Sequence, residues 1–309
     1  MDVEKRPPIE AHFLGYCPFC GESMLFLEEK TKTVHACPIC DAPIAFREVI
    51  DLEKDSLGYE IIPNTEGESF SLDGYRVENG MLLGYDGEGD KLVLPKGIFA
   101  IAPEAFKGNR RLTSITLSEG VRYIGRAAFE GCDGIKTVKL PQSLLSIGSA
   151  VFARCRHLTA ISLPKGLRVA GGSLFHGCDY LTEVLFPMDM KHLGCAPYSL
   201  CKSLRVANIP NCVTSLGCNW FYENDRLEVL YVGRNVSHLS CPSDCLRELH
   251  LSDPTGWMLY GPLGHPDIPI PEKEFSTPKA AASYLKKLKR ERRTMFRQTA
   301  AEESYWFYL

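Results

Sequence analysis

Four cysteines near the start of the chain form two closely spaced pairs. Cys17 and Cys20 lie in YCPFCGES, Cys37 and Cys40 lie in ACPICDAP, and 16 residues separate the pairs. Each C-x2-C turn presents two thiolates to one ion, and two turns complete the four-sulfur set typical of structural zinc. Because such a set leaves no open coordination position, the spacing predicts one structural Zn²⁺ ion. A redox role is the alternative, although it expects a single pair in a βαβ setting.

The residues beside the two pairs fit the same interpretation. Gly21 follows the first pair and allows a positive φ, and Asp41 follows the second and tolerates it. The stretch between the pairs is predicted to form a hairpin, and residues 1–50 resemble a zinc ribbon. These residues include 8 acidic and 5 basic side chains. Phosphate contacts need clustered cations, so the ribbon is expected to be structural or to face another protein.

A 23-residue repeat organises the middle of the chain. The phrases AAFEGC (127–132) and AVFARC (150–155) are one step apart, and six full copies follow one another without an insertion. A shortened seventh copy ends near Leu251. The aromatic column consists of Phe106, Phe129, Phe152, Phe175, Tyr198 and Phe221. A second apolar column consists of Leu112, Ile135, Leu158, Leu181, Leu204 and Leu227.

A unit of this size cannot bury its own apolar face, so stacked copies must share one continuous core. The segment LTSITL (112–117) alternates like a strand, and its copies should pair in parallel about 4.8 Å apart. The repeat therefore predicts a solenoid that is mainly β, with short helical turns. Solenoid ends need caps, and YRVENGMLLGY (75–85) contains an Asn-Gly step that suggests a hairpin covering the first coil.

The repeat resembles the BspA-like leucine-rich-repeat family. The resemblance is carried by LPQSLLSIGSAVFARCRHLTAISL (140–163) and its neighbouring copies, and it extends over residues 70–251. It implies a leucine-rich-repeat solenoid. Many members of this family are surface or secreted proteins that bind other macromolecules.

A repeated cysteine position lies inside this solenoid. Cys132, Cys155, Cys178 and Cys201 share their column with asparagines. A column that accepts either type indicates buried turn packing, because asparagine bonds the backbone and cysteine is a small residue with a weak donor. Reactive thiols would need electropositive, exposed surroundings. Small-residue packing is also expected for a second column, which consists of Cys195, Cys218 and Cys241. A second metal site there, which Cys212 and Cys245 could join, stays open as an alternative.

The sequence divides into six segments. A zinc ribbon (1–50) is followed by an acidic linker (51–69), an N-terminal cap (70–92) and the solenoid (93–251). Five prolines fall within an irregular segment or C-terminal cap (252–277), and a basic helix with an aromatic tail ends the chain (278–309). The basic face of that helix consists of Lys286, Lys287, Lys289, Arg290, Arg292 and Arg293. This face could be solvated, dock on an acidic protein surface, or meet nucleic acid or an anionic membrane.

Composition and missing motifs exclude several classes of protein. The 309-residue chain has a formal net charge of −3 and 13 cysteines. It contains no run of 18 apolar residues, and its N-terminal residues lack the apolar core of a secretory signal. We therefore expect a cytoplasmic protein. No P-loop, GxSxG, HExxH or helix-opening GxGxxG motif occurs, and the 8 histidines are scattered, so no enzyme is predicted.

The leading functional prediction is a protein–protein interaction scaffold with a zinc-stabilised N-terminus. Side chains alternate along each strand, and the outward positions of the later copies are apolar. The predicted partner face consists of Leu185, Val206, Asn208, Val229 and Tyr231. The chain's own C-terminal segments are an alternative cover for it. The other hypotheses are nucleic-acid association through the basic helix with the ribbon's assistance, and a regulatory subunit of an unidentified enzyme.

Overall fold

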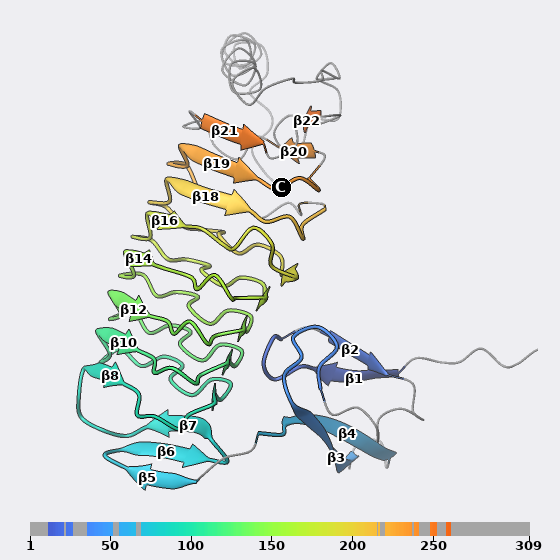
Figure 1. Ribbon diagram of the computed structural model, residues 1–309, viewed down its shortest axis with the longest axis vertical. Helices are drawn as coiled ribbons and strands as arrows, with labels where there is room; N and C mark the ends of the chain where they lie inside the picture. Colours follow the sequence, from blue (N-terminus) through green and yellow to red (C-terminus); the bar gives the residue numbers. More distant parts are fainter. Residues whose placement is uncertain are drawn as a thin grey trace, which may run out of the picture.

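A computed structural model gives the fold of the protein (Figure 1). It describes residues 12–21, 23–26, 36–51, 56–65, 69–214, 216, 220–236, 238–240, 248–251 and 258–260. The predicted basic helix and most of the predicted irregular segment lie outside these ranges. The described residues form 22 strands and no helix. No helix long and apolar enough to cross a membrane occurs among them.

The N-terminal module consists of two antiparallel pairs of strands. β1 (His12–Tyr16) pairs with β2 (Ser23–Phe26), and β3 (Ile44–Asp51) pairs with β4 (Ser56–Pro63). The predicted linker at 51–69 is therefore wrong over β4. The acidic composition of the segment favoured a linker, but Tyr59, Ile61 and Ile62 have high β-propensity and lie in this strand.

The N-terminal cap of the solenoid is an antiparallel meander. Its strands are β5 (Phe70–Leu72), β6 (Tyr75–Glu78) and β7 (Met81–Tyr85). Asn79 and Gly80 connect β6 to β7 with φ angles of 48° and 73°. These values are the positive-φ backbone that an Asn-Gly hairpin turn requires, so the hairpin prediction is confirmed. β7 then pairs in parallel with the first strand of the flank row described below.

The repeat builds two rows of parallel strands, and each strand pairs with its copy about one repeat away. In the front row, Ile115 lies beside Leu92 and Val138, which confirms the predicted parallel pairing. This row contains β8 (Lys91–Val93), β10 (Ser114–Thr116), β12 (Thr137–Lys139), β14 (Ala160–Ile161), β16 (Glu183–Val184), β18 (Val206–Ile209), β19 (Val229–Val232) and β21 (Glu248–Leu251) (Figure 1). Its hydrogen-bonded ladder is interrupted between β14 and β16, so the row consists of two four-stranded sheets.

The flank row forms the second side of the solenoid, continuing from β7 of the cap. It contains β9 (Ala100–Ile101), β11 (Tyr123–Ile124), β13 (Ser146–Ile147), β15 (Val169–Ala170) and β17 (His192–Leu193). A separate parallel pair consists of β20 (His238–Ser240) and β22 (Met258–Tyr260). β22 lies in the segment predicted to be irregular or a cap, so part of that segment extends the sheet structure.

Turns connect the two rows where the sequence predicts short helical segments. Glu104 and Gly108 in one coil have φ angles of 59° and 73°, and Ala127 and Gly131 in the next have 56° and 70°. A left-handed residue every few positions ends a right-handed helix before it completes a turn. The described coils consequently contain isolated hydrogen-bonded turns, and the prediction of helical turns is wrong for them.

The core is a continuous stack of repeated side chains. Phe129, Phe152 and Phe175 are fully buried, with ring centroids 5.8 and 5.9 Å apart between successive coils. Tyr198 fills the gap in this column, and its hydroxyl donates to the backbone carbonyl of Asn208 at 2.8 Å. One coil thus packs on the next through identical positions, as a 23-residue solenoid requires.

Candidate metal centre

The four N-terminal cysteines lie on two tight turns. One turn follows β1 and carries Cys17 and Cys20, and the other precedes β3 and carries Cys37 and Cys40. Each turn is closed by a 2.9 Å hydrogen bond from the residue after the pair, to the Cys17 carbonyl in one and the Cys37 carbonyl in the other. These two residues are Gly21 and Asp41, and their φ angles are 79° and 58°. The sequence prediction of two positive-φ positions is confirmed.

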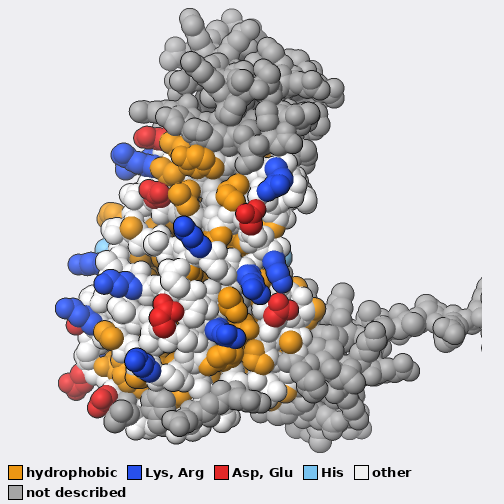
Figure 2. Space-filling view, viewed as in Figure 1, with side chains coloured by type: hydrophobic (Ala, Val, Ile, Leu, Met, Phe, Trp, Pro, Cys, Tyr) orange, Lys and Arg blue, Asp and Glu red, His pale blue; other side chains and the backbone are white. Residues whose placement is uncertain are grey.

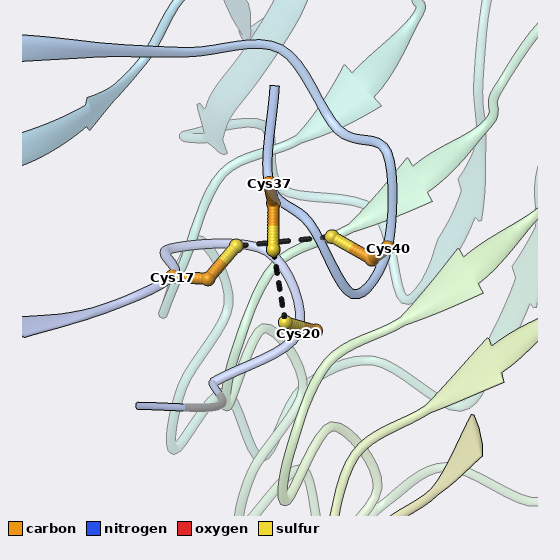
Figure 3. Close-up of side chains that lie close together, drawn as sticks. All are labelled: Cys17, Cys20, Cys37 and Cys40. Carbon is orange, nitrogen blue, oxygen red and sulfur yellow. Dashed lines mark hydrogen bonds between the residues drawn. The ribbon is translucent and has the colours of Figure 1, made fainter. Parts of the chain in front are cut away.

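The turns bring the four sulfur atoms together in one buried cluster (Figure 3). The Sγ atoms of Cys17 and Cys40 are 3.8 Å apart, as are those of Cys20 and Cys37. All four ligand atoms lie within 4.8 Å of one another. Zinc–sulfur bonds of about 2.3 Å in a tetrahedron place sulfurs about 3.8 Å apart. The cluster therefore has the dimensions of a four-thiolate metal site.

Because the four thiols lie close together, hydrogen bonds among them shift their pKa values in opposite directions. A hydrogen bond from Cys17 lowers the pKa of Cys37 below its usual range. The hydrogen bond shared with Cys17 raises the pKa of Cys20, because that thiol keeps its proton while its neighbour carries charge. A bound cation releases protons from such a set and holds it as thiolates. The cluster is thus chemically suited to a soft divalent metal.

Four of the five residues of the predicted partner face have side chains that reach solvent. The side chains of Leu185 and Tyr231 are 41% and 39% exposed, and Val206 and Val229 are half-buried. Asn208 is only 3% exposed, so its placement on this face was wrong.

The side chain of Asn208 bonds to the backbone of the preceding coil. Its Oδ1 accepts from the amide of Phe186 and its Nδ2 donates to the carbonyl of Phe186, both at 2.7 Å. β16 pairs with β18 over only two residues. The asparagine side chain therefore provides the hydrogen bonds of the next ladder position, which draws it into the sheet.

The repeated cysteines pack inside the turns, as predicted. Cys132, Cys155, Cys178 and Cys201 are fully buried. Each Sγ donates to a phenylalanine carbonyl 26 residues earlier, at 3.0 to 3.2 Å. The asparagine equivalent, Asn224, accepts from the amide of Cys201 at 3.0 Å, so cysteine and asparagine satisfy backbone groups at the same column.

These thiols are expected to resist alkylation in the folded protein. Burial raises the pKa of Cys132 and of Cys201 to about 12, and the thiolate is the reactive species. We expect no labelling of the four column cysteines at pH 8 by mass spectrometry before denaturation, and complete labelling after it. The exposed Cys195 is the internal control and should react at once.

The raised pKa of these thiols also gives the sign of the pH dependence of folding stability. A raised folded-state pKa favours the protonated, folded form, so its stabilisation is complete below pH 9 and declines as the pH rises toward 12. Rapid labelling of a column cysteine in native protein at pH 8 would refute the packing role.

The other predicted sites have less support. Among the described residues, the N-terminal cluster is the only metal-capable group. Cys195 is exposed and Cys212 half-buried, and neither belongs to such a group. Cys218, Cys241 and Cys245 lie outside the described residues, as do the six basic-helix residues from Lys286 to Arg293.

Sequence reasoning did not predict that the cysteine module packs against the solenoid. Phe19 and Ile44 of the module share one buried cluster with Ala100, Tyr123 and Val169 of the flank row. The available signal was Ser149, which has Gly172 and Cys195 as its copies in the following coils. Small residues in this column leave room for a neighbouring backbone, but nothing in the sequence identifies that neighbour.

Comparison with known proteins supports a leucine-rich-repeat assignment for the solenoid. Residues 99–228 match the family model for the BspA type leucine rich repeat region in six copies. The match does not include the four clustered cysteines. No curated protein matches the chain.

Several solved structures are similar to the chain. A leucine-rich repeat protein of T. pallidum shares 24% identity over 68% of this chain and 86% of that chain, with a TM-score of 0.48. One from Bacteroides ovatus shares 22% identity over 64% and 68%, with a TM-score of 0.43. The pneumococcal vaccine antigen PcpA shares 18% over 61% and 42%, with a TM-score of 0.34.

Proposed function

We propose that this chain is a non-enzymatic recognition protein that binds another protein through the front row of its solenoid. Leucine-rich-repeat proteins are generally interaction or recognition modules, and stacked repeats provide extended binding surfaces. The observation that carries the proposal is the outer face, which we define as Glu183, Leu185, Val206, Val229 and Tyr231. It combines apolar exposure with adjacent arginines that pair with no acidic side chain among the described residues.

The apolar part of the outer face lies at β16, β18 and β19 of the front row. Val184, Ala207 and Leu230 are fully buried. The outer-face residues beside them in sequence therefore point away from the core, because side chains alternate along a strand. Figure 2 shows hydrophobic side chains gathered over β18 and β19, with lysine and arginine side chains beside them. Exposed apolar side chains grouped in this way favour a protein partner, and tyrosine is a common anchor at interfaces.

A hollow beside one end of these strands is lined in part by charged side chains. It has a volume of about 590 Å³, and Tyr180, Glu183, Arg205 and Arg226 are among its lining residues. Arg205 and Arg226 are exposed and pair with no acidic side chain in the described part of the chain. Lys202, in contrast, lies 3.5 Å from the carboxylate of Asp179. The unpaired arginines favour a partner segment that carries carboxylates beside apolar side chains.

The second part of the proposal is that the cysteine cluster binds one structural Zn²⁺ ion. Its support is the buried four-sulfur set with tetrahedral spacing. Bound zinc would hold together two turns that share a small core, and all four ligands would be protein thiolates, which leaves no position for catalysis. Thiolate ligands and buried thiols persist in a reducing compartment, so the proposal includes a cytoplasmic location.

A charge placed on the outer face tests the recognition surface. Affinity capture with full-length Leu185→Asp should recover about tenfold less of the specific partner than capture with the wild type, because an interface anchor contributes more than 1 kcal/mol to binding. The capture uses nuclease-treated lysate and quantitative mass spectrometry. Tyr222 is 53% exposed on the turn side, so Tyr222→Ser is the matched control.

The same experiment distinguishes a protein partner from a nucleic-acid partner. A protein that wild type and Tyr222→Ser capture equally, and that Leu185→Asp loses, supports the proposed surface. Equal capture by all three proteins contradicts it. Recovery of nucleic acid from untreated lysate, with steep loss as salt rises, would instead indicate phosphate contacts.

A further inference from the structure

Residues in and beside the flank row bind the cysteine module by donating hydrogen bonds to both of its turns. In the first turn, the Cys20 carbonyl accepts from the amide of Ser149 at 3.1 Å and from its hydroxyl at 2.8 Å. The neighbouring Pro18 carbonyl accepts from the amide of Arg126 at 3.2 Å. One metal-binding turn is thus held at three points by residues more than 100 positions away in the sequence.

The second turn is held by a different pair of residues. The hydroxyl of Tyr123 donates to the Asp41 carbonyl at 3.3 Å. The Asp41 carboxylate lies 3.5 Å from the ammonium group of Lys191. Asp41 directly follows the ligand Cys40, so the solenoid contacts the backbone of both cysteine turns, at Cys20 in the first and at Asp41 in the second.

The solenoid surface leaves room for the first of these turns to approach closely. A Cβ atom on Gly148 would lie 2.2 Å from the Phe19 carbonyl oxygen, and one on Gly171 would lie 2.6 Å from the Cys20 carbonyl oxygen. Side chains cannot be accommodated at such distances, so two glycines of successive coils allow backbone-to-backbone contact. The same glycines also lie against the backbone of their own neighbouring coil, and their substitution would damage the solenoid itself.

Apolar burial strengthens the same contact. The ring of Phe19, which lies between two of the clustered cysteines, is fully buried with its centroid 5.4 Å from that of Tyr123. Tyr123 in turn lies 5.3 Å from the ring of Phe99. The module therefore shares a core with the flank row, and the cysteine turns cannot move apart without disturbing this aromatic group.

From these contacts we infer that the metal centre is a composite of the module and the solenoid, in which Ser149 and Tyr123 are positioning residues. They do not touch the ion. They hold the backbone of the turns that carry Cys20 and Cys40, and thereby fix the directions of two ligands, one in each turn. Outer contacts of this kind typically change metal affinity 10- to 100-fold when they are removed. The inference rests on the proposed binding of zinc.

Two conservative variants of the full-length protein test these roles. Ser149→Ala and Tyr123→Phe each remove one hydroxyl and leave the packing in place. Each variant is expected to release zinc to a chromogenic chelator about tenfold faster than wild type. Ser162→Ala and Tyr222→Phe are the matched controls, because both residues are exposed at a distance from the module, and they should release zinc at the wild-type rate.

The thermal transition of the solenoid is measured in the same samples. Faster release with an unchanged transition supports the positioning role, whereas a lowered transition with unchanged release would show that the hydroxyls serve only the fold. Wild-type release rates in both variants would overturn the inference and leave the proposed zinc site intact. A wild-type protein that contains no zinc would overturn the zinc site, and the inference with it.

Discussion

Cys37→Ser is expected to reduce the zinc content of the purified protein from about one ion per chain to nearly none. A serine hydroxyl stays protonated at neutral pH, and the three remaining sulfurs cannot complete the tetrahedral set. Structural zinc contributes an apparent binding free energy of about 10–16 kcal/mol in small modules, so the loss of one ligand has a large effect. Elemental analysis of the variant and the wild type at equal protein concentration measures the zinc content per chain.

The change should remain largely local to the module. The buried cluster around the cysteines is separate from the continuous core of the repeats, so the solenoid should keep a cooperative unfolding transition. Cys195→Ser is the matched control, because Cys195 is an exposed cysteine outside the cluster. Zinc retained by Cys37→Ser at the wild-type level, or lost equally from Cys195→Ser, would show that the ion is bound elsewhere.

The largest loss of stability is expected from Phe152→Ala. Phe152 is fully buried between the rings of Phe129 and Phe175, at centroid distances of 5.8 and 5.9 Å. Truncation to alanine leaves a cavity in the middle of the stack and removes contacts with two coils. The free energy of unfolding should fall by about 3–5 kcal/mol, as measured by urea denaturation with unchanged m-value.

A surface truncation provides the comparison for this experiment. Val93 lies in a strand of the front row and is 60% exposed, so Val93→Ala should change the free energy of unfolding by less than about 0.5 kcal/mol. A loss below about 1 kcal/mol for Phe152→Ala would mean that the aromatic column is not the centre of the core. An equal loss for both variants would contradict the assignment of inward and outward positions.

The regular parts of the fold were predictable because one repeat period fixes both packing and pairing. Residues 23 positions apart lie side by side, so Leu112 and Ile135 indicate the core and LTSITL indicates the strand. The four clustered cysteines were predictable from spacing alone, because two C-x2-C turns satisfy one tetrahedral ion. In both cases local sequence and tertiary structure impose the same constraint.

The remaining features depend on neighbours that the sequence does not identify. Asn208 occupies an outward position by alternation, but the short pairing of β16 leaves the backbone of Phe186 available to it. Left-handed residues such as Ala127 are ordinary in sequence, and only the coil geometry requires their φ of 56°. Ser149 likewise resembles any small turn residue until the cysteine module lies against it.

Hydrogen exchange tests most directly the claim that metal binding and the solenoid flank form one unit. The amides of Arg126 and Ser149 donate to carbonyls of the first cysteine turn at 3.2 and 3.1 Å, whereas the amide of Leu117 bonds within the front row, to the carbonyl of Lys139 at 3.0 Å. In Cys37→Ser compared with wild type, exchange at Arg126 and Ser149 is predicted to accelerate while exchange at Leu117 stays the same. Wild-type exchange at Arg126 and Ser149 in a variant shown to lack zinc would contradict the account.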